Sequence, residues 1–74
     1  MKLPTVSGKQ VIKALMKAGF RPVSKRGSHV KLKKRTPTGT LVVIVPDHKK
    51  VSKGTLRDII KDAGLTVEEF CRLL

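Results

Sequence analysis

Two turn sequences divide residues 20–46 into segments too short to be helices, and this stretch constrains the fold more than any other. Arg26-Gly27-Ser28 and Thr36-Pro37-Thr38-Gly39 both contain residues that turns favour. Glycine supplies positive φ angles and proline presets φ, so each sequence favours a reversal of the chain. We therefore predict three strands, at residues 20–25, 29–35 and 41–45.

The middle segment shows the alternation of a strand with one buried face. Val30 and Leu32 fall on one side, whereas His29, Lys31 and Lys33 fall on the other. Successive side chains of a strand point to opposite faces. The pattern therefore predicts that His29 lies on a basic face that is exposed to water.

The two neighbouring strands have different features. Residues 41–45 form an uninterrupted apolar run of mostly β-branched residues, which we expect to be the best-buried strand. Pro46 ends this run. Pro22 cannot donate a hydrogen bond to a sheet, so the strand at residues 20–25 is expected at an edge, or with a bent start.

Helix-start sequences lie on both sides of the strand region. Ser7 and Gln10 have the spacing of a capping box, and so do Thr66 and Glu69. The first box precedes an apolar stripe at helical spacing. The members of that stripe are Val11, Ile12, Leu15 and Met16.

Two further helices are expected after the strands. Ser52 is the predicted cap of a helix at residues 53–63, and Gly64 is a natural helix end. Residues 67–74 follow the second capping box as a short third helix. The order is then α-β-β-β-α-α, which is an α+β fold, and we expect one domain over residues 1–74.

Charge is distributed unevenly along the chain. The net charge is +12, and residues 1–46 contain eleven Lys or Arg but no Asp or Glu. Such an excess favours polyanions or acidic partners. The only aromatic residues, Phe20 and Phe70, are too few for base stacking to dominate recognition. We therefore expect a partner such as RNA, recognised by backbone charge and shape.

His29 is the candidate catalytic residue. A histidine exchanges protons near neutral pH, and its neutral ring can act as a general base. Here it would take the proton of a ribose 2′-hydroxyl, whose oxygen attacks the adjacent phosphate and leaves a 2′,3′-cyclic phosphate without a metal ion. The phosphate ligands expected around it are Lys25, Arg26, Lys31 and Lys33. The alternative is a solvent-exposed turn histidine with no chemical role.

A second group of candidates surrounds the start of the helix at residues 53–63, where free backbone N–H groups attract anions. The candidate RNA contacts there are Lys49, Lys50 and Lys53. Ser28 in the turn is a further candidate contact. His48 is an acid partner for His29, a phosphate contact or a residue without a function, and we favour binding or structure over catalysis.

Several kinds of site are not expected. No Cys and His cluster has zinc spacing, no group of carboxylates suits Mg²⁺ and no phosphate-cradling glycine motif occurs, so we expect neither a metal nor a cofactor. The longest apolar run, residues 41–45, is too short to cross a membrane, and no secretion leader is expected. Cys71 is the only cysteine, which fits a reducing cytoplasm.

Several motifs follow one another along nearly the whole chain. They are Ser7 to Ile12, Ala18-Gly19-Phe20, Gly27-Ser28-His29, Gly54 to Ile60 and Ala63 to Phe70. In this order and spacing they resemble the HicA family, the toxins of HicA–HicB toxin–antitoxin modules. Many relatives carry a second histidine or an aromatic residue after the Gly-Ser-His motif, where this chain has Val30 and Leu32.

The resemblance implies a fold like that of double-stranded-RNA-binding domains, with helices on one face of a three-stranded antiparallel sheet. It implies an mRNA interferase, an endoribonuclease that blocks translation, whose catalytic histidine corresponds to His29. It also implies a HicB-type antitoxin that covers the site, and the charge of +12 suits an acidic surface on that partner.

Two other functions fit the same composition. One is a non-catalytic binder of double-stranded RNA, and the other is a small ribosome-associated protein. Both would use the basic surface, and neither requires a histidine in the turn. The Gly27-Ser28-His29 sequence therefore favours the endoribonuclease.

Overall fold

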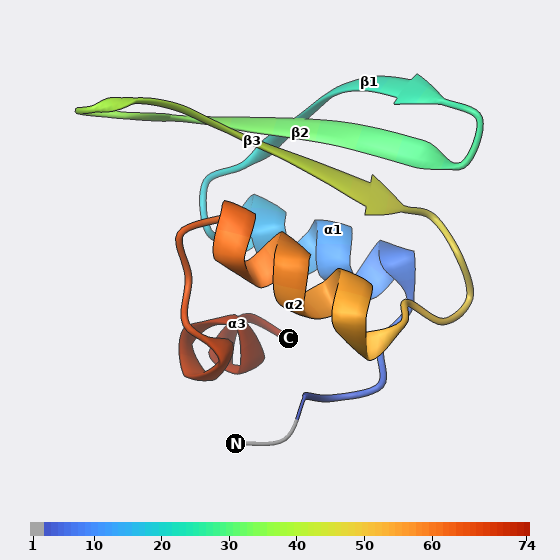
Figure 1. Cartoon of the computed structure of the whole chain (residues 1–74). Helices are drawn as coiled ribbons and strands as arrows, with labels where there is room; N and C mark the ends of the chain where they lie inside the picture. Colours follow the sequence, from blue (N-terminus) through green and yellow to red (C-terminus); the bar gives the residue numbers. More distant parts are fainter. Residues whose placement is uncertain (1–2) are drawn as a thin grey trace.

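The structure, a computed structural model that describes residues 3–74, is a three-stranded sheet covered on one face by helices (Figure 1). Its elements are α1 (Gly8–Lys17), β1 (Arg21–Arg26), β2 (His29–Thr36), β3 (Gly39–Pro46), α2 (Lys53–Asp62) and α3 (Val67–Leu73). The predicted order of elements and the α+β class are confirmed. The layout of helices on one face of an antiparallel sheet is like that of double-stranded-RNA-binding domains.

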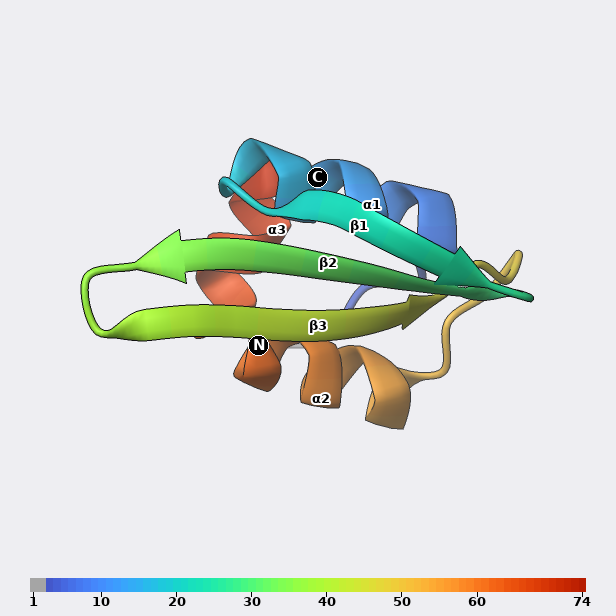
Figure 2. The same ribbon diagram turned by 90° about the horizontal axis from the view of Figure 1, so that it is seen from above.

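The sheet is antiparallel, with β2 between β1 and β3 (Figure 2). Gly27 has a φ of +60°, which lets the chain reverse between β1 and β2 within two residues. The register of β1 against β2 shifts between Pro22 and Ser24, so that Val23 is the extra residue of a bulge. The predicted edge position of the proline-containing strand is confirmed.

The core fills the space between the sheet and the helices. Val30 and Leu32 of β2, together with Val43 and Val45 of β3, are buried against the helical layer. α1 lies below the β1 side of the sheet, α2 lies below the β3 side, and α3 packs on both helices from beneath (Figures 1 and 2). The short α3 is held by Phe70, which is fully buried in this core.

All three predicted helix starts are confirmed. Both capping boxes form, since each cap side chain accepts a hydrogen bond from the third helical residue, whose own side chain accepts one from the cap backbone. The side chain of Ser52 accepts a hydrogen bond from the backbone N–H of Thr55, and α2 begins at the next residue. These caps fix where α1, α2 and α3 begin relative to the strands.

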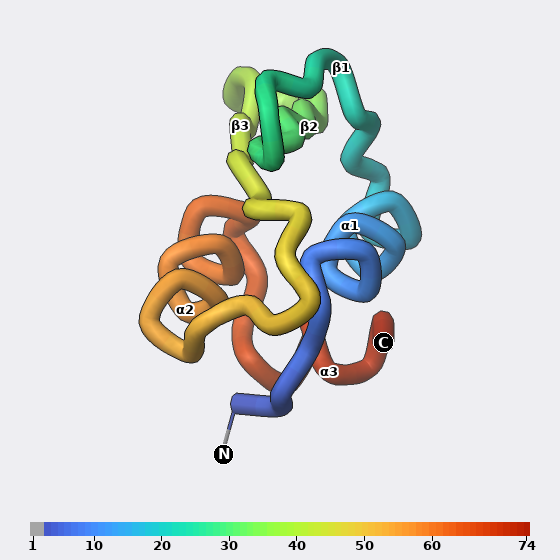
Figure 3. Tube along the Cα trace, turned by 90° about the vertical axis from the view of Figure 1, so that its right-hand side faces the viewer, coloured from blue at the N-terminus to red at the C-terminus, as the bar shows by residue number. Residues whose placement is uncertain are grey.

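Two predictions about burial are wrong. β3 is not the best-buried strand, because Val42 and Ile44 are 41% and 54% exposed and β3 buries no more residues than β2. The helices cover only one face of the sheet (Figure 3), so a strand that alternates between faces must expose half of its apolar residues. Met16 of the predicted stripe is also exposed, whereas Val11 and Leu15 are buried as expected and Ile12 packs against the core.

Backbone hydrogen bonds join three segments at the end of the sheet where β1 turns into β2. The loop at residues 47–51 receives or donates each of them. The bonds link Asp47 to Ser28 in the turn, His48 to Gly8 at the start of α1, and Val51 to Val6. The hairpin tip, the start of α1 and the approach to α2 are therefore held together.

Gly8 is required by this junction. A Cβ atom at residue 8 would meet the carbonyl oxygen of Pro46 and would lie 2.7 Å from the Cα atom of Asp47. Both neighbours are backbone atoms that cannot rotate away. The backbone N–H of Gly8 also donates to the carbonyl of His48 at 2.8 Å.

We therefore expect Gly8→Ala to lower the free energy of unfolding by about 1–3 kcal/mol, because an overpacked methyl group must displace backbone. Gly54→Ala is the matched control, since Gly54 lies in the first turn of α2 with no atom within 4 Å of the added Cβ. That change should be neutral or stabilising by up to about 1 kcal/mol. Urea unfolding measures both, and equal effects would contradict the close approach at Gly8.

Candidate nucleic-acid interface

The face of the sheet that points away from the helices carries His29. Its neighbour in β2, Val30, is buried, whereas His29 itself is exposed, as the predicted alternation requires. His29 is paired with Arg26 of β1 on one side and with Pro46 of β3 on the other. Residues directly opposite in an antiparallel pair share a face, so the guanidinium of Arg26 belongs to the same outward surface.

The same surface continues along the sheet away from His29. Lys31 lies between Ser24 and Ile44, and Lys33 lies between Arg21 and Val42. Together with Arg35 on the same face of β2, this gives a row of cations beside an apolar row. We call this the outward face; its residues are Arg21, Ser24, Arg26, His29, Lys31, Lys33, Arg35, Thr40, Val42, Ile44 and Pro46.

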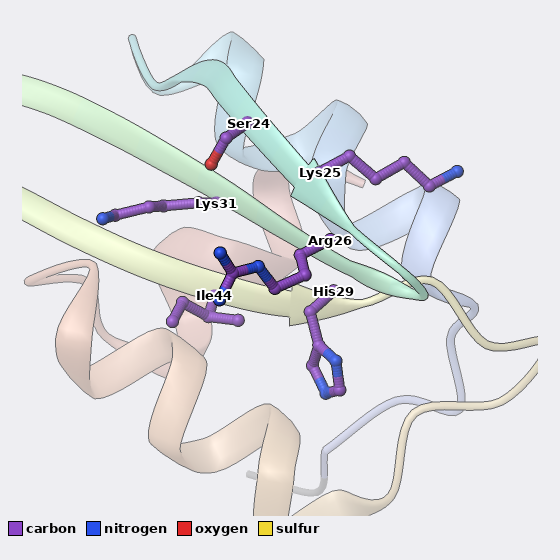
Figure 4. Close-up of a pocket in the computed structure, with 6 residues that line it drawn as sticks. All are labelled: Ser24, Lys25, Arg26, His29, Lys31 and Ile44. Atoms are coloured by element: carbon purple, nitrogen blue, oxygen red, sulfur yellow. The ribbon is translucent and has the colours of Figure 1, made fainter.

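A hollow of about 630 Å³ opens on this face next to the histidine. It is lined by Ser24, Lys25, Arg26, His29, Lys31 and Ile44. The Arg26 side chain lies across the strands toward Ile44, between Lys31 and His29 (Figure 4). An imidazole that can exchange protons thus shares one hollow with a guanidinium and an ammonium, which are the groups that bind phosphate in proteins.

Lys25 lies apart from the rest of the predicted cluster. It is paired with the buried Val30, so it starts from the helix side of β1. Its Nζ atom lies 3.6 Å from Oδ2 of Asp47, and in Figure 4 its side chain extends away from the other labelled residues. Lys25 therefore reaches only the rim of the hollow, and an acid already neutralises part of its charge.

The second predicted group lies at the end of the sheet rather than on the outward face. His48 and Lys49 line a separate hollow of about 380 Å³ together with Ser7, Lys9 and Asp47. Lys50 and Lys53 are exposed on either side of the α2 cap. The start of α2 and the β1–β2 turn with Ser28 lie at the same end of the molecule (Figure 1). The two histidines thus line different hollows, and the structure does not bring His48 into the hollow of His29.

The charge around His29 is one-sided. None of the outward-face residues is acidic, and four of the five acids lie in α2 or α3, below the sheet. Within residues 3–74, the His29 imidazole makes no hydrogen bond to another protein group. An anion would therefore meet cations and a free imidazole on this surface.

In the part of the chain that the structure describes, no three His, Cys, Asp or Glu residues are grouped so that they could hold a metal ion. Within the same range, none of the helices has the length and hydrophobicity that a membrane span requires.

Sequence reasoning missed several residues of the outward face. Arg35 is not among the predicted phosphate ligands, although it continues the alternation of Lys31 and Lys33. Arg21 is outward only because of the bulge at Val23, which no local pattern reveals. The exposure of Ile44 is not apparent from the sequence, because an unbroken apolar run conceals which residues face the helices.

Comparison with known proteins identifies the family. A family model described as the HicA toxin of bacterial toxin–antitoxin systems matches residues 8–65, from the first residue of α1 to the end of the turn after α2. The match includes the whole sheet and every residue that lines the hollow of His29, and residues 1–7 and 66–74 lie outside it. No curated protein matches the chain. The chain belongs to the HicA family of toxins from bacterial toxin–antitoxin systems.

Proposed function

We propose that this toxin is an endoribonuclease that cleaves mRNA and so blocks translation in the cytoplasm. The observation that carries the proposal is the position of His29, exposed in a cation-lined hollow on a face without acids. RNA is a polyanion that offers both the phosphate these cations attract and the 2′-hydroxyl that a histidine can deprotonate. A HicB-type antitoxin would neutralise the toxin by covering this face.

The chemistry needs one proton acceptor and positive charge beside the phosphate. The His29 imidazole takes the 2′-hydroxyl proton, and the 2′-oxygen forms a bond to the adjacent phosphorus. The bond from phosphorus to the 5′-oxygen breaks, and that oxygen takes a proton from water. Arg26 and Lys31 stabilise the charge that builds on the phosphate oxygens, so the mechanism assigns no step to a metal ion.

The remaining cations extend the binding surface. Lys33 and Arg35 continue the row along β2, where a single strand of RNA would follow the sheet. Lys49, Lys50 and Lys53, with Ser28, would hold phosphates at the end of the molecule. Lys25 contributes less than its neighbours because Asp47 pairs with it. His48 is assigned to phosphate contact, since it lines a different hollow from His29.

One observation favours a second candidate, a non-catalytic RNA-binding protein that acts on double-stranded RNA or on the ribosome. A general base is usually oriented by a hydrogen bond to its other nitrogen, and within residues 3–74 His29 has no such partner. In this candidate the basic face still binds RNA, but His29 has no catalytic role.

Replacing the histidine distinguishes the two candidates. We expect His29→Ala to slow cleavage of a labelled RNA in EDTA by about 10²–10⁴-fold, which is the usual contribution of a general base. Binding and folding should persist, because the side chain is exposed. Arg72→Ala, an exposed change on α3, is the control and should cleave like the wild type.

Cyclic-phosphate ends made by the wild type but not by His29→Ala would support the endoribonuclease. If neither protein cleaves but both bind RNA, the chain is the non-catalytic binder. If both cleave at equal rates, His29 has no part in the reaction. The same assay on His48→Ala tests an acid role for His48, for which we expect less than about a tenfold loss.

Salt dependence tests the binding surface independently of cleavage. Each phosphate contact to single-stranded RNA contributes about 0.7 to the slope of log affinity against log salt. We expect Lys31→Ala and Lys53→Ala each to lower the slope by about that amount and Arg72→Ala to leave it unchanged. The affinities are measured by fluorescence anisotropy with His29→Ala as the background, so that the RNA stays intact. An unchanged slope for Lys31→Ala would show that the outward face of the sheet does not contact the RNA phosphates.

A further inference from the structure

The two edges of the sheet differ in how they resist pairing with another chain. β1 contains a proline, a bulge at Val23 and several charged side chains, all of which hinder the addition of a strand. β3 keeps an unbroken register with β2, has no charged residue, and ends with its only proline, Pro46. α2 lies in the layer below β3 (Figure 1), and within residues 3–74 no strand lies beside β3 on the side opposite β2. β3 is therefore an unprotected edge.

The backbone of β3 offers a free row of hydrogen-bonding groups. Thr36 and Gly39 close a two-residue turn and form a hydrogen-bonded pair, after which the two kinds of pair alternate along the ladder. By this alternation Thr40, Val42 and Ile44 direct their N–H and C=O groups away from β2. Within residues 3–74, no hydrogen bond outside the sheet involves the backbone of these three residues.

The side chains of the same residues are also unpartnered. Ile44 is 54% exposed and Val42 is 41% exposed, although both are large and apolar. Their side chains share the outward face, next to the free backbone groups. An added strand would therefore complete the ladder and cover this apolar row at the same time.

The charge around the β3 edge indicates which kind of molecule could pair with it. The neighbouring strand carries Lys31, Lys33 and Arg35 on the outward face, and residues 21–46 contain no acid. A second copy of this chain would bring the same cations and another charge of +12. A nucleic acid has no row of peptide groups with which to pair. An acidic polypeptide in extended conformation satisfies both the backbone and the charge.

We propose that a partner protein adds an acidic β-strand to the β3 edge, paired with Thr40, Val42 and Ile44. Its apolar side chains cover Val42 and Ile44, and its carboxylates are reached by Lys31 and Lys33. In a toxin–antitoxin family the antitoxin is the natural source of such a strand. The inference deepens the proposed function in that it names how the partner is held, but the pairing itself does not depend on RNA cleavage.

The test uses an eight-residue synthetic peptide, as long as β3, in which one face of the strand carries valine and glutamate in turn and the other face carries serine. Amide exchange of the whole chain is followed by NMR with and without the peptide. We expect exchange to slow by about tenfold or more at Thr40, Val42 and Ile44, because their N–H groups gain acceptors. The amides of Leu41, Val43 and Val45 already face β2, so they serve as internal controls.

Two controls separate backbone pairing from attraction between charges. The same peptide with all amides N-methylated keeps its charge and side chains but cannot form a ladder, so its affinity should fall by about tenfold or more. A peptide with lysine in place of glutamate should be weakened by a similar factor. Both tests use the unaltered protein and do not depend on whether a variant folds.

A matched pair of variants locates the edge. Val42→Pro removes an N–H group from β3, and Val23→Pro does the same on β1, where the side chain is similarly exposed at 51%. The peptide should lose affinity for the first variant only. Circular dichroism establishes that each variant is folded, and the RNA cleavage assay on each shows whether catalysis is intact.

Three outcomes would overturn the inference: no slowing of exchange at saturating peptide, equal affinity for the N-methylated peptide, or protection of Thr40, Val42 and Ile44 by self-association without peptide. The last would make a second copy the occupant. If the chain binds the peptide at β3 but does not cleave RNA, the strand pairing is supported and the endoribonuclease activity is rejected. If the chain cleaves RNA but does not bind the peptide, the endoribonuclease activity is supported and the strand pairing is rejected.

Discussion

The backbone junction at residues 47–51 is the constraint on which the rest of the molecule depends. It connects the β1–β2 turn, the start of α1 and the approach to α2 by main-chain hydrogen bonds, and it passes α1 so closely that only glycine fits at residue 8. The strands are crowded with cations that repel one another. Hydrogen bonds between backbone groups do not require any side chain to change its charge. They can therefore hold the end of the sheet, including His29, in place despite the repulsion between the cations.

Elements determined by nearby residues could be predicted from the sequence. A capping box involves residues three apart, and both boxes formed as expected. The alternation from His29 to Lys33 is also local, because it needs only the geometry of one strand. The exposure of His29 followed from that pattern before any partner strand was known. The fold class and the position of the candidate catalytic residue were therefore accessible from the sequence.

Features that depend on contacts between distant segments could not be predicted. An apolar run such as residues 41–45 does not reveal that helices cover only one face of the sheet, so the exposure of Ile44 was missed. Lys25 and Arg26 were grouped as neighbours in sequence, but adjacent residues of a strand point to opposite faces, and register assigns only Arg26 to the face of His29. The roles of the grouped residues remain predictions.

The bulge in β1 has a consequence for the composition of the outward face. In a regular strand, Arg21 and Arg26 are an odd number of residues apart and would point to opposite sides of the sheet. The extra residue at Val23 shifts the count by one, so both guanidinium groups emerge on the same side. The charge of this surface is thus governed by spacing as well as by residue type. A family member that lacked only this one residue would turn Arg21 toward its own core.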